Sequence, residues 1–302
     1  MAIIGPTAVG KTSVSISLAE RLGAEIVSAD SRLFYRGMDI GTAKPTPEER
    51  QRVPHHLIDV AEPDQTWSLA LFQQRARLAI ADIHARDGLP FLVGGAGQYI
   101  RAVIQGWQPP QVVPDARLRL VLEAWAAEIG PLGLYERLRQ LDPVAAEGID
   151  PRNLRRTVRA LEVILTSGER FSDQRRSNPS PYHLLTLGLI RPRLELYERI
   201  DRRIDAMIAA GLVEEVRALL DRGYPPDLPT LSAIGYREIV AVLQGDLILD
   251  DAIRAIKRAT RVLVRRQANW FKPDDPGIYW FRADAEPERA METMIQGFLA
   301  SH

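Results

Sequence analysis

The sequence contains no cysteine among its 302 residues. Disulfide bonds and thiolate metal sites are therefore excluded, and the absence fits a reducing cytoplasm. An excess of charge is also missing, because 39 basic residues balance 39 acidic ones. Net charge therefore does not indicate nucleic-acid binding, although a balanced total can hide a basic face.

Lysine is scarce, and the basic residues are arginine except for Lys11, Lys44, Lys257 and Lys272. Arginine binds phosphate through a planar fork and stacks on bases. GC-rich codon usage explains the same bias at least as well, so composition alone leaves the partner open.

Long apolar runs are missing too. No stretch approaches the length of a membrane span, and no cleavable signal pattern is present. We therefore expect a cytoplasmic protein with no membrane partner, and we expect a monomer. Hydrophobic residues make up 46% of the chain and charged residues 26%, which is typical of a globular protein that buries a sizeable core.

Short apolar runs alternate with amphipathic stretches in the first part of the chain. This pattern predicts an α/β fold with a parallel sheet flanked by helices. The expected strands are 1–4, 24–29, 56–60, 89–93 and 183–190, with a possible edge strand at 278–281. The expected helices outside the middle segment are 11–22, 68–86, one beginning at 98, 194–210, 212–222, 232–244 and 250–271.

The middle segment differs, because residues 115–176 show no convincing strand. Helices are expected there at 118–129, 132–141 and 152–166. The economical interpretation is an all-helical insertion domain at 111–182 within an α/β core domain formed by 1–110 and 183–302.

A glycine-rich motif joins the first expected strand to the first expected helix, and it consists of Gly5, Pro6, Thr7, Ala8, Val9, Gly10, Lys11 and Thr12. Its glycines let the backbone curl so that amide hydrogens point at phosphate oxygens, and the helix adds its positive end. Lys11 supplies a charge, and the Thr12 hydroxyl can hold Mg²⁺. The motif predicts a P-loop core, which indicates a phosphate ligand without specifying ATP.

The acid that holds magnesium in an ATPase or GTPase is missing from its usual place. The buried strand at 89–93 runs into Gly94 and Gly95, whereas an acid ends the second strand, at Asp30. Ligands bind at this edge of such sheets, so Asp30 is a candidate general base. Asp30 and Ser31 also look like a helix start, and position alone supports a capping or salt-bridge role equally.

Two other patterns carry less weight. The segment at 94–97 lacks the third glycine and the acid of a dinucleotide fingerprint, so we interpret it as a tight turn close to a ligand. His55 and His56 are adjacent and would point to opposite faces of a strand. A structural role is therefore favoured over a metal site.

Several segments along the chain form a pattern when they are considered together. They are the P-loop, 29–31, 35–45, 54–59, 93–95, 159–163 and 235–237. In this order and spacing they resemble the tRNA dimethylallyltransferase family, also called tRNA isopentenyltransferases. The resemblance covers nearly the whole chain. Its most specific part is the stretch at 35–45, which reads YRGMDIGTAKP.

The resemblance implies transfer of a dimethylallyl group from dimethylallyl diphosphate to N6 of the adenosine at position 37 of a tRNA anticodon stem-loop. It implies Mg²⁺ as the cofactor and pyrophosphate as the leaving group, which makes the missing hydrolytic acid understandable. Asp30 would accept the N6 proton, and Lys11 and Arg217 would be the other catalytic residues. The target base must leave its stack and enter a pocket.

The resemblance also implies contacts to tRNA, at Asp30, Ser31, Arg32, Leu33, Ala96, Arg119, Arg155, Arg156, Thr157, Val158, Arg159, Gly235, Tyr236 and Arg237. The chain departs from the family pattern at two of these positions. Leu33 stands where the family often has glutamine, and Ala96 stands where it commonly has threonine near the pyrophosphate. The contacts made by those two side chains in the family therefore cannot be transferred.

Two arginine-rich stretches offer an RNA-binding surface. One contains Arg152, Arg155, Arg156 and Arg159, and the other contains Arg254, Arg258, Arg261 and Arg265 at helical spacing. Either stretch alone is better explained as a solvated helix face. Together with the family resemblance, they favour RNA.

Three alternatives to tRNA prenyl transfer share some of these features. A small-molecule kinase would use the same core, but the acid after residue 93 is missing. An adenylate isopentenyltransferase would not need two arginine-rich surfaces. A nucleotide-gated RNA-binding module would leave Asp30 beside the P-loop without a role.

Overall fold

The computed structural model describes every residue except 109, 111, 175, 178–179 and 302. The chain divides into two compact units. The first comprises Met1–Val103 and Tyr182–His302, and the second comprises Ile104–Pro181.

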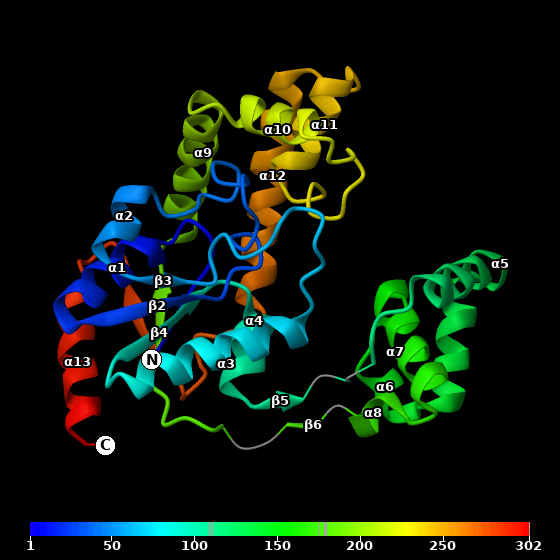
Figure 1. Cartoon of the computed structure of the whole chain (residues 1–302), viewed down its shortest axis with the longest axis horizontal. Helices are drawn as coiled ribbons and strands as arrows, with labels where there is room; N and C mark the ends of the chain where they lie inside the picture. Colours follow the sequence, from blue (N-terminus) through cyan, green and yellow to red (C-terminus); the bar gives the residue numbers. More distant parts are fainter. Residues whose placement is uncertain (109, 111, 175, 178–179, 302) are drawn as a thin grey trace. The chain divides into compact units, whose positions relative to one another are not determined.

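The first unit is built on a six-stranded sheet in which every pairing is parallel (Figure 1). Its order is β3-β2-β4-β1-β7-β8. The strands are β1 (Ala2–Ile4), β2 (Ala24–Ser28), β3 (His55–His56), β4 (Leu89–Gly94), β7 (Thr186–Ile190) and β8 (Tyr279–Arg282). The predicted α/β class with a parallel, helix-flanked sheet is confirmed.

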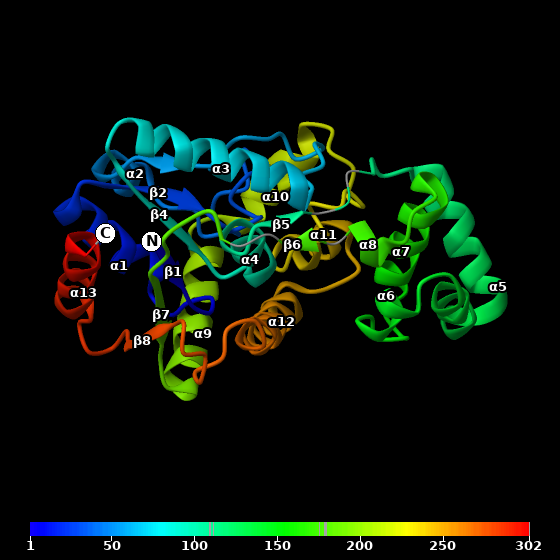
Figure 2. The same cartoon turned by 90° about the horizontal axis from the view of Figure 1, so that it is seen from below.

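Helices cover both faces of this sheet, with α3 on one face and α1 and α13 on the other (Figure 2). The helices of the unit are α1 (Lys11–Leu22), α2 (Pro47–Arg52), α3 (Leu69–Ala85), α4 (Gly97–Ile104), α9 (Arg193–Ala209), α10 (Leu212–Asp221), α11 (Tyr236–Gln244), α12 (Leu249–Ala268) and α13 (Glu288–Ala300). Since β1 and β4 are buried on both faces, their sequences are continuously apolar.

Local sequence signals explain several helix ends. The Ser68 side chain accepts a hydrogen bond from the Leu71 N–H and caps α3, whose start was expected at 68. Thr46 and Glu49 form a reciprocal capping box at the start of α2. Gly235 has a φ of 97°, so α11 begins only at Tyr236 and not at residue 232.

The strand expected at 56–60 is much shorter, since β3 consists of His55 and His56 alone. Leu57 and Asp59 have φ values of 63° and 55°, in the left-handed region. A strand cannot continue through such residues. The predicted edge strand is confirmed as β8, which pairs with β7.

The second unit is mainly helical and has its own core. Its helices are α5 (Ala116–Leu141), α6 (Pro143–Glu147), α7 (Leu154–Ser167) and α8 (Phe171–Gln174). Gly130, with a φ of 80°, interrupts α5 where two separate helices were expected. Leu122, Leu134 and Leu161 lie in the core. Two strands of two residues each, β5 (Trp107–Gln108) and β6 (Arg176–Ser177), pair antiparallel and were missed because such short pieces leave no periodicity.

Candidate active site

The glycine-rich motif lies between β1 and α1, which is the arrangement that a P-loop requires. Gly10 has a φ of 115° and sits at the N-cap of α1. A Cβ on Gly5 would lie 2.8 Å from the Leu189 carbonyl oxygen, so that glycine permits a close approach to β7. No partner takes the N–H groups of Lys11 and Thr12 at the start of α1 in the part of the chain that the structure describes. They are free to bind an anion.

Two arginines bind backbone carbonyl groups of the P-loop. Arg191 Nε donates to the Val9 carbonyl at 2.9 Å, and Arg199 Nε donates to the Ala8 carbonyl at 2.8 Å. A trans peptide directs its carbonyl and N–H groups to opposite sides. Holding the Val9 carbonyl therefore turns the Gly10 N–H away from Arg191.

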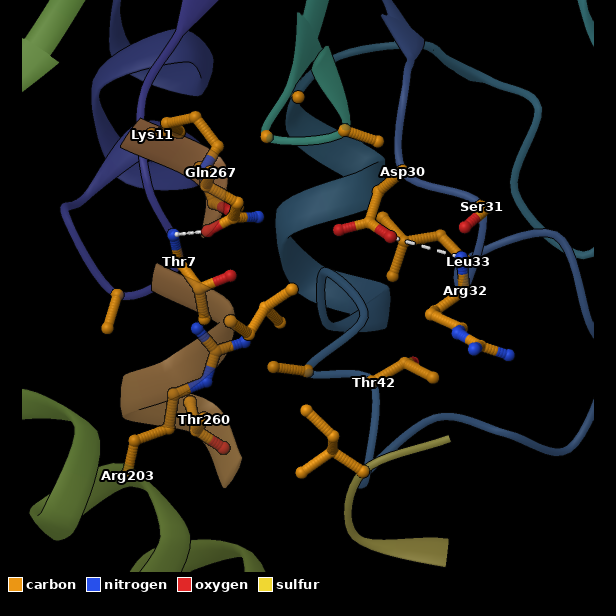
Figure 3. Close-up of a pocket in the computed structure, with 18 of the residues that line it drawn as sticks. Thr7, Lys11, Asp30, Ser31, Arg32, Leu33, Thr42, Arg203, Thr260 and Gln267 are labelled. Carbon is orange, nitrogen blue, oxygen red and sulfur yellow. Dashed lines mark hydrogen bonds between the residues drawn. The ribbon is translucent and has the colours of Figure 1, made fainter. Parts of the chain in front are cut away.

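Lys11 has an unusual electrostatic environment. Its Nζ donates to the Pro6 carbonyl at 2.8 Å. Burial lowers the pKa of Lys11 to about 8, while the Asp30 carboxylate acts in the opposite direction and Arg203 reinforces the lowering. The three side chains thus influence one another, and Figure 3 shows them directed into the same space.

That space is a cavity of about 960 Å³ within the first unit. The predicted residues that line it are Thr7, Ala8, Gly10, Lys11, Thr12, Asp30, Ser31, Arg32, Leu33, Ala96, Gly235 and Tyr236. Gly5, Pro6 and Val9 shape the P-loop without lining the cavity. The structure therefore brings the loop, the end of β2 and the start of α11 together around one volume.

The Asp30 carboxylate can both cap the turn after β2 and act as a general base. One carboxylate oxygen accepts a hydrogen bond from the Arg32 N–H at 3.0 Å, which closes the turn after β2. Figure 3 shows the other oxygen directed into the cavity. The turn fixes the side chain and leaves an acceptor for a ligand.

The family-like stretch at 35–45 forms part of the cavity wall, held by Glu215 of α10. The Glu215 carboxylate accepts hydrogen bonds from the N–H groups of Asp39, Ile40 and Gly41 at 2.8, 2.7 and 3.1 Å. It also accepts one from the Tyr236 hydroxyl at 2.6 Å. Burial, followed by the Glu215 charge, strongly raises the pKa of Tyr236, so this hydroxyl stays a donor.

Close packing fixes the same wall. A Cβ on Gly41 would lie 2.5 Å from the Tyr236 ring, so no larger residue fits there without movement. Lys44 is almost fully buried and donates to the Tyr35 carbonyl and the Asp59 carboxylate at 2.8 and 2.6 Å. This explains why so specific a sequence occupies 35–45.

Arg217 and Arg237 do not line the cavity. The Arg217 side chain is half exposed on α10, and its nearest acid is Glu214, at 3.8 Å. Arg237 pairs with Glu238 at 2.6 Å. The geometry gives no support to a catalytic role for Arg217, whereas Arg203 of α9 does line the cavity near Lys11 and Asp30.

Sequence reasoning missed Arg199, Arg203, Thr260 and Gln267, which all line the cavity. Arg199 and Arg203 stand four residues apart on one face of α9, a spacing that is visible in the sequence. Nothing in the sequence indicates that this face meets a P-loop almost two hundred residues earlier.

In the second unit, a fully buried carboxylate organises two of the predicted tRNA-binding arginines. Glu162 accepts two hydrogen bonds from Arg119, both at 2.9 Å, and one from Arg159 at 2.6 Å. Burial by itself would raise the pKa of Glu162, but these bonds hold it below its ordinary value. Thr157 and Val158 are buried, whereas Arg155 and Arg156 are exposed.

The basic stretch on α12 is only partly neutralised by ion pairs. Arg254 pairs with Asp251 on the same helix, and Lys257 and Arg261 pair with Asp205 and Asp201 of α9. The sequence of α12 alone does not show that acids of α9 lie against it. The side chains that remain exposed, with no ion pair to the described residues, are Arg258, Arg265, Arg266 and Lys272.

We also searched the described residues for clusters of metal ligands and for membrane-spanning helices. The described residues contain no group of three or more histidine, aspartate or glutamate side chains that could hold a metal ion. His56 instead pairs with Glu25 at 2.7 Å. None of the helices in the described ranges is both long and apolar enough to cross a membrane.

A family model described as IPP transferase matches residues 33–274, and one described as isopentenyl transferase matches residues 1–61. The chain belongs to the IPP transferase family. A curated relative from Roseiflexus sp. (strain RS-1), named tRNA dimethylallyltransferase, is 55% identical over 94% of this chain and 93% of its own length. The predicted family is confirmed.

Solved structures of tRNA-modifying prenyltransferases have a similar fold. A tRNA isopentenylpyrophosphate transferase from Bacillus halodurans is 43% identical, with a TM-score of 0.74 over 99% of this chain and 96% of that one. A eukaryotic dimethylallyltransferase, described as acting on tRNA, is 25% identical, with a TM-score of 0.83 over 100% of this chain and 79% of that one. The shared fold extends over both described units.

Proposed function

We propose that the chain transfers a dimethylallyl group from dimethylallyl diphosphate to N6 of the adenosine at position 37 in a tRNA anticodon stem-loop. The observation that carries this proposal is the shared cavity of the P-loop and Asp30. A phosphate-binding loop opposite a free carboxylate oxygen suits a reaction that releases a phosphate group and a proton together. The relatives named tRNA dimethylallyltransferase support the same substrate class.

The reaction forms a bond between N6 and the allylic carbon and breaks the bond between that carbon and the diphosphate oxygen. The electron pair of the broken bond leaves with pyrophosphate, while the N6 proton passes to Asp30. Lys11 and the amides at the start of α1 stabilise the growing negative charge. Arg203, which lines the cavity, would assist them, whereas Arg217 does not line it.

The donor set fits Mg²⁺. The Thr12 hydroxyl and the buried Ser28 hydroxyl both line the cavity, and Ser28 Oγ has no hydrogen-bond partner among the described residues. Mg²⁺ prefers hard oxygen ligands and usually combines one or two protein groups with substrate phosphates and water. When bound, it would add positive charge beside the leaving pyrophosphate.

We place tRNA contacts in both units. In the first unit they involve the turn at 30–33, Ala96 and the residues at 235–237; in the second, treated as an insertion domain at about 111–182, they involve Arg119, Arg155, Arg156 and Arg159. The buried Thr157 and Val158 support that helix from inside. We also propose that the active form is a monomer.

Incubating the protein with dimethylallyl diphosphate, Mg²⁺ and an unmodified anticodon stem-loop tests the proposal. Mass spectrometry of the digested RNA should show prenylated adenosine at position 37. A product formed only with AMP would instead identify an adenylate isopentenyltransferase. Phosphate release from ATP without prenyl transfer would identify a kinase or ATPase.

A further inference from the structure

The last turn of α12 reaches the P-loop through one side chain. Gln267 Oε1 accepts a hydrogen bond from the Thr7 N–H at 2.8 Å, across 260 residues of sequence (Figure 3). A backbone N–H can only donate, so the atom that it meets must be the amide oxygen. The contact therefore fixes the orientation of the side-chain amide and turns the NH₂ group the other way.

The NH₂ group of Gln267 lies beside Lys11. A Cβ built on Gly95 would lie 2.7 Å from Gln267 Nε2 and 3.4 Å from Lys11 Nζ, so both nitrogens border the same point. Gln267 and Lys11 line the cavity. Among the residues that the structure describes, none accepts a hydrogen bond from Nε2. Two N–H groups are thus available next to the ammonium.

The end of α12 is held firmly in this place. A Cβ on Gly97 would lie 2.2 Å from the Trp270 ring, so the indole sits directly against the α4 backbone. Arg101 donates to the Trp270 carbonyl, and its guanidinium lies 5.7 Å from the ring centroids of both Trp270 and Phe271. Gln267 is therefore a fixed group, which lowers the entropic cost of using it.

We infer that Gln267 is a diphosphate-binding residue, whose NH₂ group donates to an oxygen of the diphosphate held by Lys11. The inference rests on the proposed function for the identity of that ligand. A neutral donor adds stabilisation without repelling Lys11 and Arg203, which a third cation would do. The neighbouring Ala96 has no side-chain donor, so Gln267 supplies one on that side of the cavity.

Binding of inorganic pyrophosphate with Mg²⁺ to the full chain, measured by calorimetry, tests this directly. Gln267→Leu removes the donor and should weaken binding roughly tenfold. Gln267→Glu keeps an oxygen for the Thr7 N–H but places a negative charge beside the anion, so binding should weaken roughly a hundredfold. Gln244→Glu makes the same change at an exposed end of α11 and should bind like the parent.

Unchanged binding by Gln267→Glu would overturn the inference. If pyrophosphate binding is weaker in Gln267→Leu but not in Gln267→Glu, Gln267 only anchors the loop, and the inference is wrong. If Gln267→Leu binds pyrophosphate more tightly than the parent, Gln267 blocks the Thr7 N–H, and the inference is again wrong. The measurement uses no tRNA. A parent protein that binds pyrophosphate in the expected pattern but transfers no prenyl group would disprove the proposed function and leave the inference standing.

Discussion

Asp30 uses its two carboxylate oxygens for different purposes. One accepts the Arg32 N–H and closes a turn, and the other is directed into the cavity. The same turn that looks like a helix start in the sequence therefore holds the proposed base in position. This arrangement is economical, because a base needs fixed placement as much as it needs basicity.

Replacement of Asp30 by asparagine separates these roles. The asparagine side chain can still accept the Arg32 N–H, but it cannot take up the N6 proton. We expect Asp30→Asn to lower kcat by about 10²- to 10⁴-fold, with pyrophosphate affinity within a few-fold of the parent. Steady-state kinetics and calorimetry measure the two effects, with Asp246→Asn on the exposed surface as control. A kcat within a few-fold of the parent would exclude Asp30 as the base.

The pKa of Lys11, lowered to about 8 mainly by burial, predicts a pH dependence. Below pH 8 the side chain is charged and attracts the diphosphate, and above pH 8 it becomes neutral. Pyrophosphate affinity should therefore fall about tenfold between pH 7 and pH 9. Calorimetry on the parent and on Lys11→Met checks this, since the variant also shows the titration of the ligand itself. Parallel curves for the two proteins would disprove the assignment to Lys11.

At the scale of elements, α10 acts on the cavity through the stretch at 35–45. One Glu215 carboxylate accepts four hydrogen bonds, of which three come from consecutive backbone N–H groups. Such a chain segment has no regular structure of its own to satisfy these groups. The Glu215 carboxylate therefore accepts the backbone hydrogen bonds that a neighbouring strand would accept in a sheet.

Removal of this carboxylate should loosen the wall. We expect Glu215→Ala to cost about 3 kcal/mol, because it leaves several donors unpaired, and to lower the thermal midpoint by roughly 5 to 10 °C. Glu214→Ala is the matched control, since its side chain is exposed and lies 3.8 Å from its nearest cation. Differential scanning calorimetry distinguishes them, and equal midpoints would show that Glu215 does not hold the wall.

The sequence predicts those elements whose signals are local. The P-loop, helix α3 and the apolar strand β4 all depend on neighbouring residues, and all were expected. The length of strand β3 was overestimated, because Leu57 and Asp59 adopt positive φ although neither is glycine. Arg203 and Gln267 were missed because their importance comes from contacts across the fold, which no periodicity records.

At the scale of the whole molecule, the charge balance of zero conceals an uneven distribution. The α12 arginines are partly neutralised by α9, whereas Arg155 and Arg156 of the second unit are exposed and have no ion pair with the described residues. The exposed basic side chains of the second unit are therefore the clearer candidates for contact with phosphate.

Arg155 and Arg156 should therefore contribute to the salt dependence of tRNA binding. The double replacement Arg155→Ala and Arg156→Ala should reduce the slope of log K against log salt by about 1.4, for two phosphate contacts to a single strand. Filter binding between about 50 and 200 mM salt measures the slope. Arg139→Ala on α5 is the control, since Arg139 pairs with Glu136 at 2.5 Å. An unchanged slope would place the tRNA elsewhere.

The hydrogen bond between Thr7 and Gln267 also has a consequence for synthesis on the ribosome. The P-loop is translated before the residue that meets it, which follows 260 residues later. At ordinary elongation rates this delay is on the order of tens of seconds. A nascent chain thus carries an unfinished anion site until α12 emerges, so a product terminated before α12 would bind diphosphate more weakly than the finished enzyme.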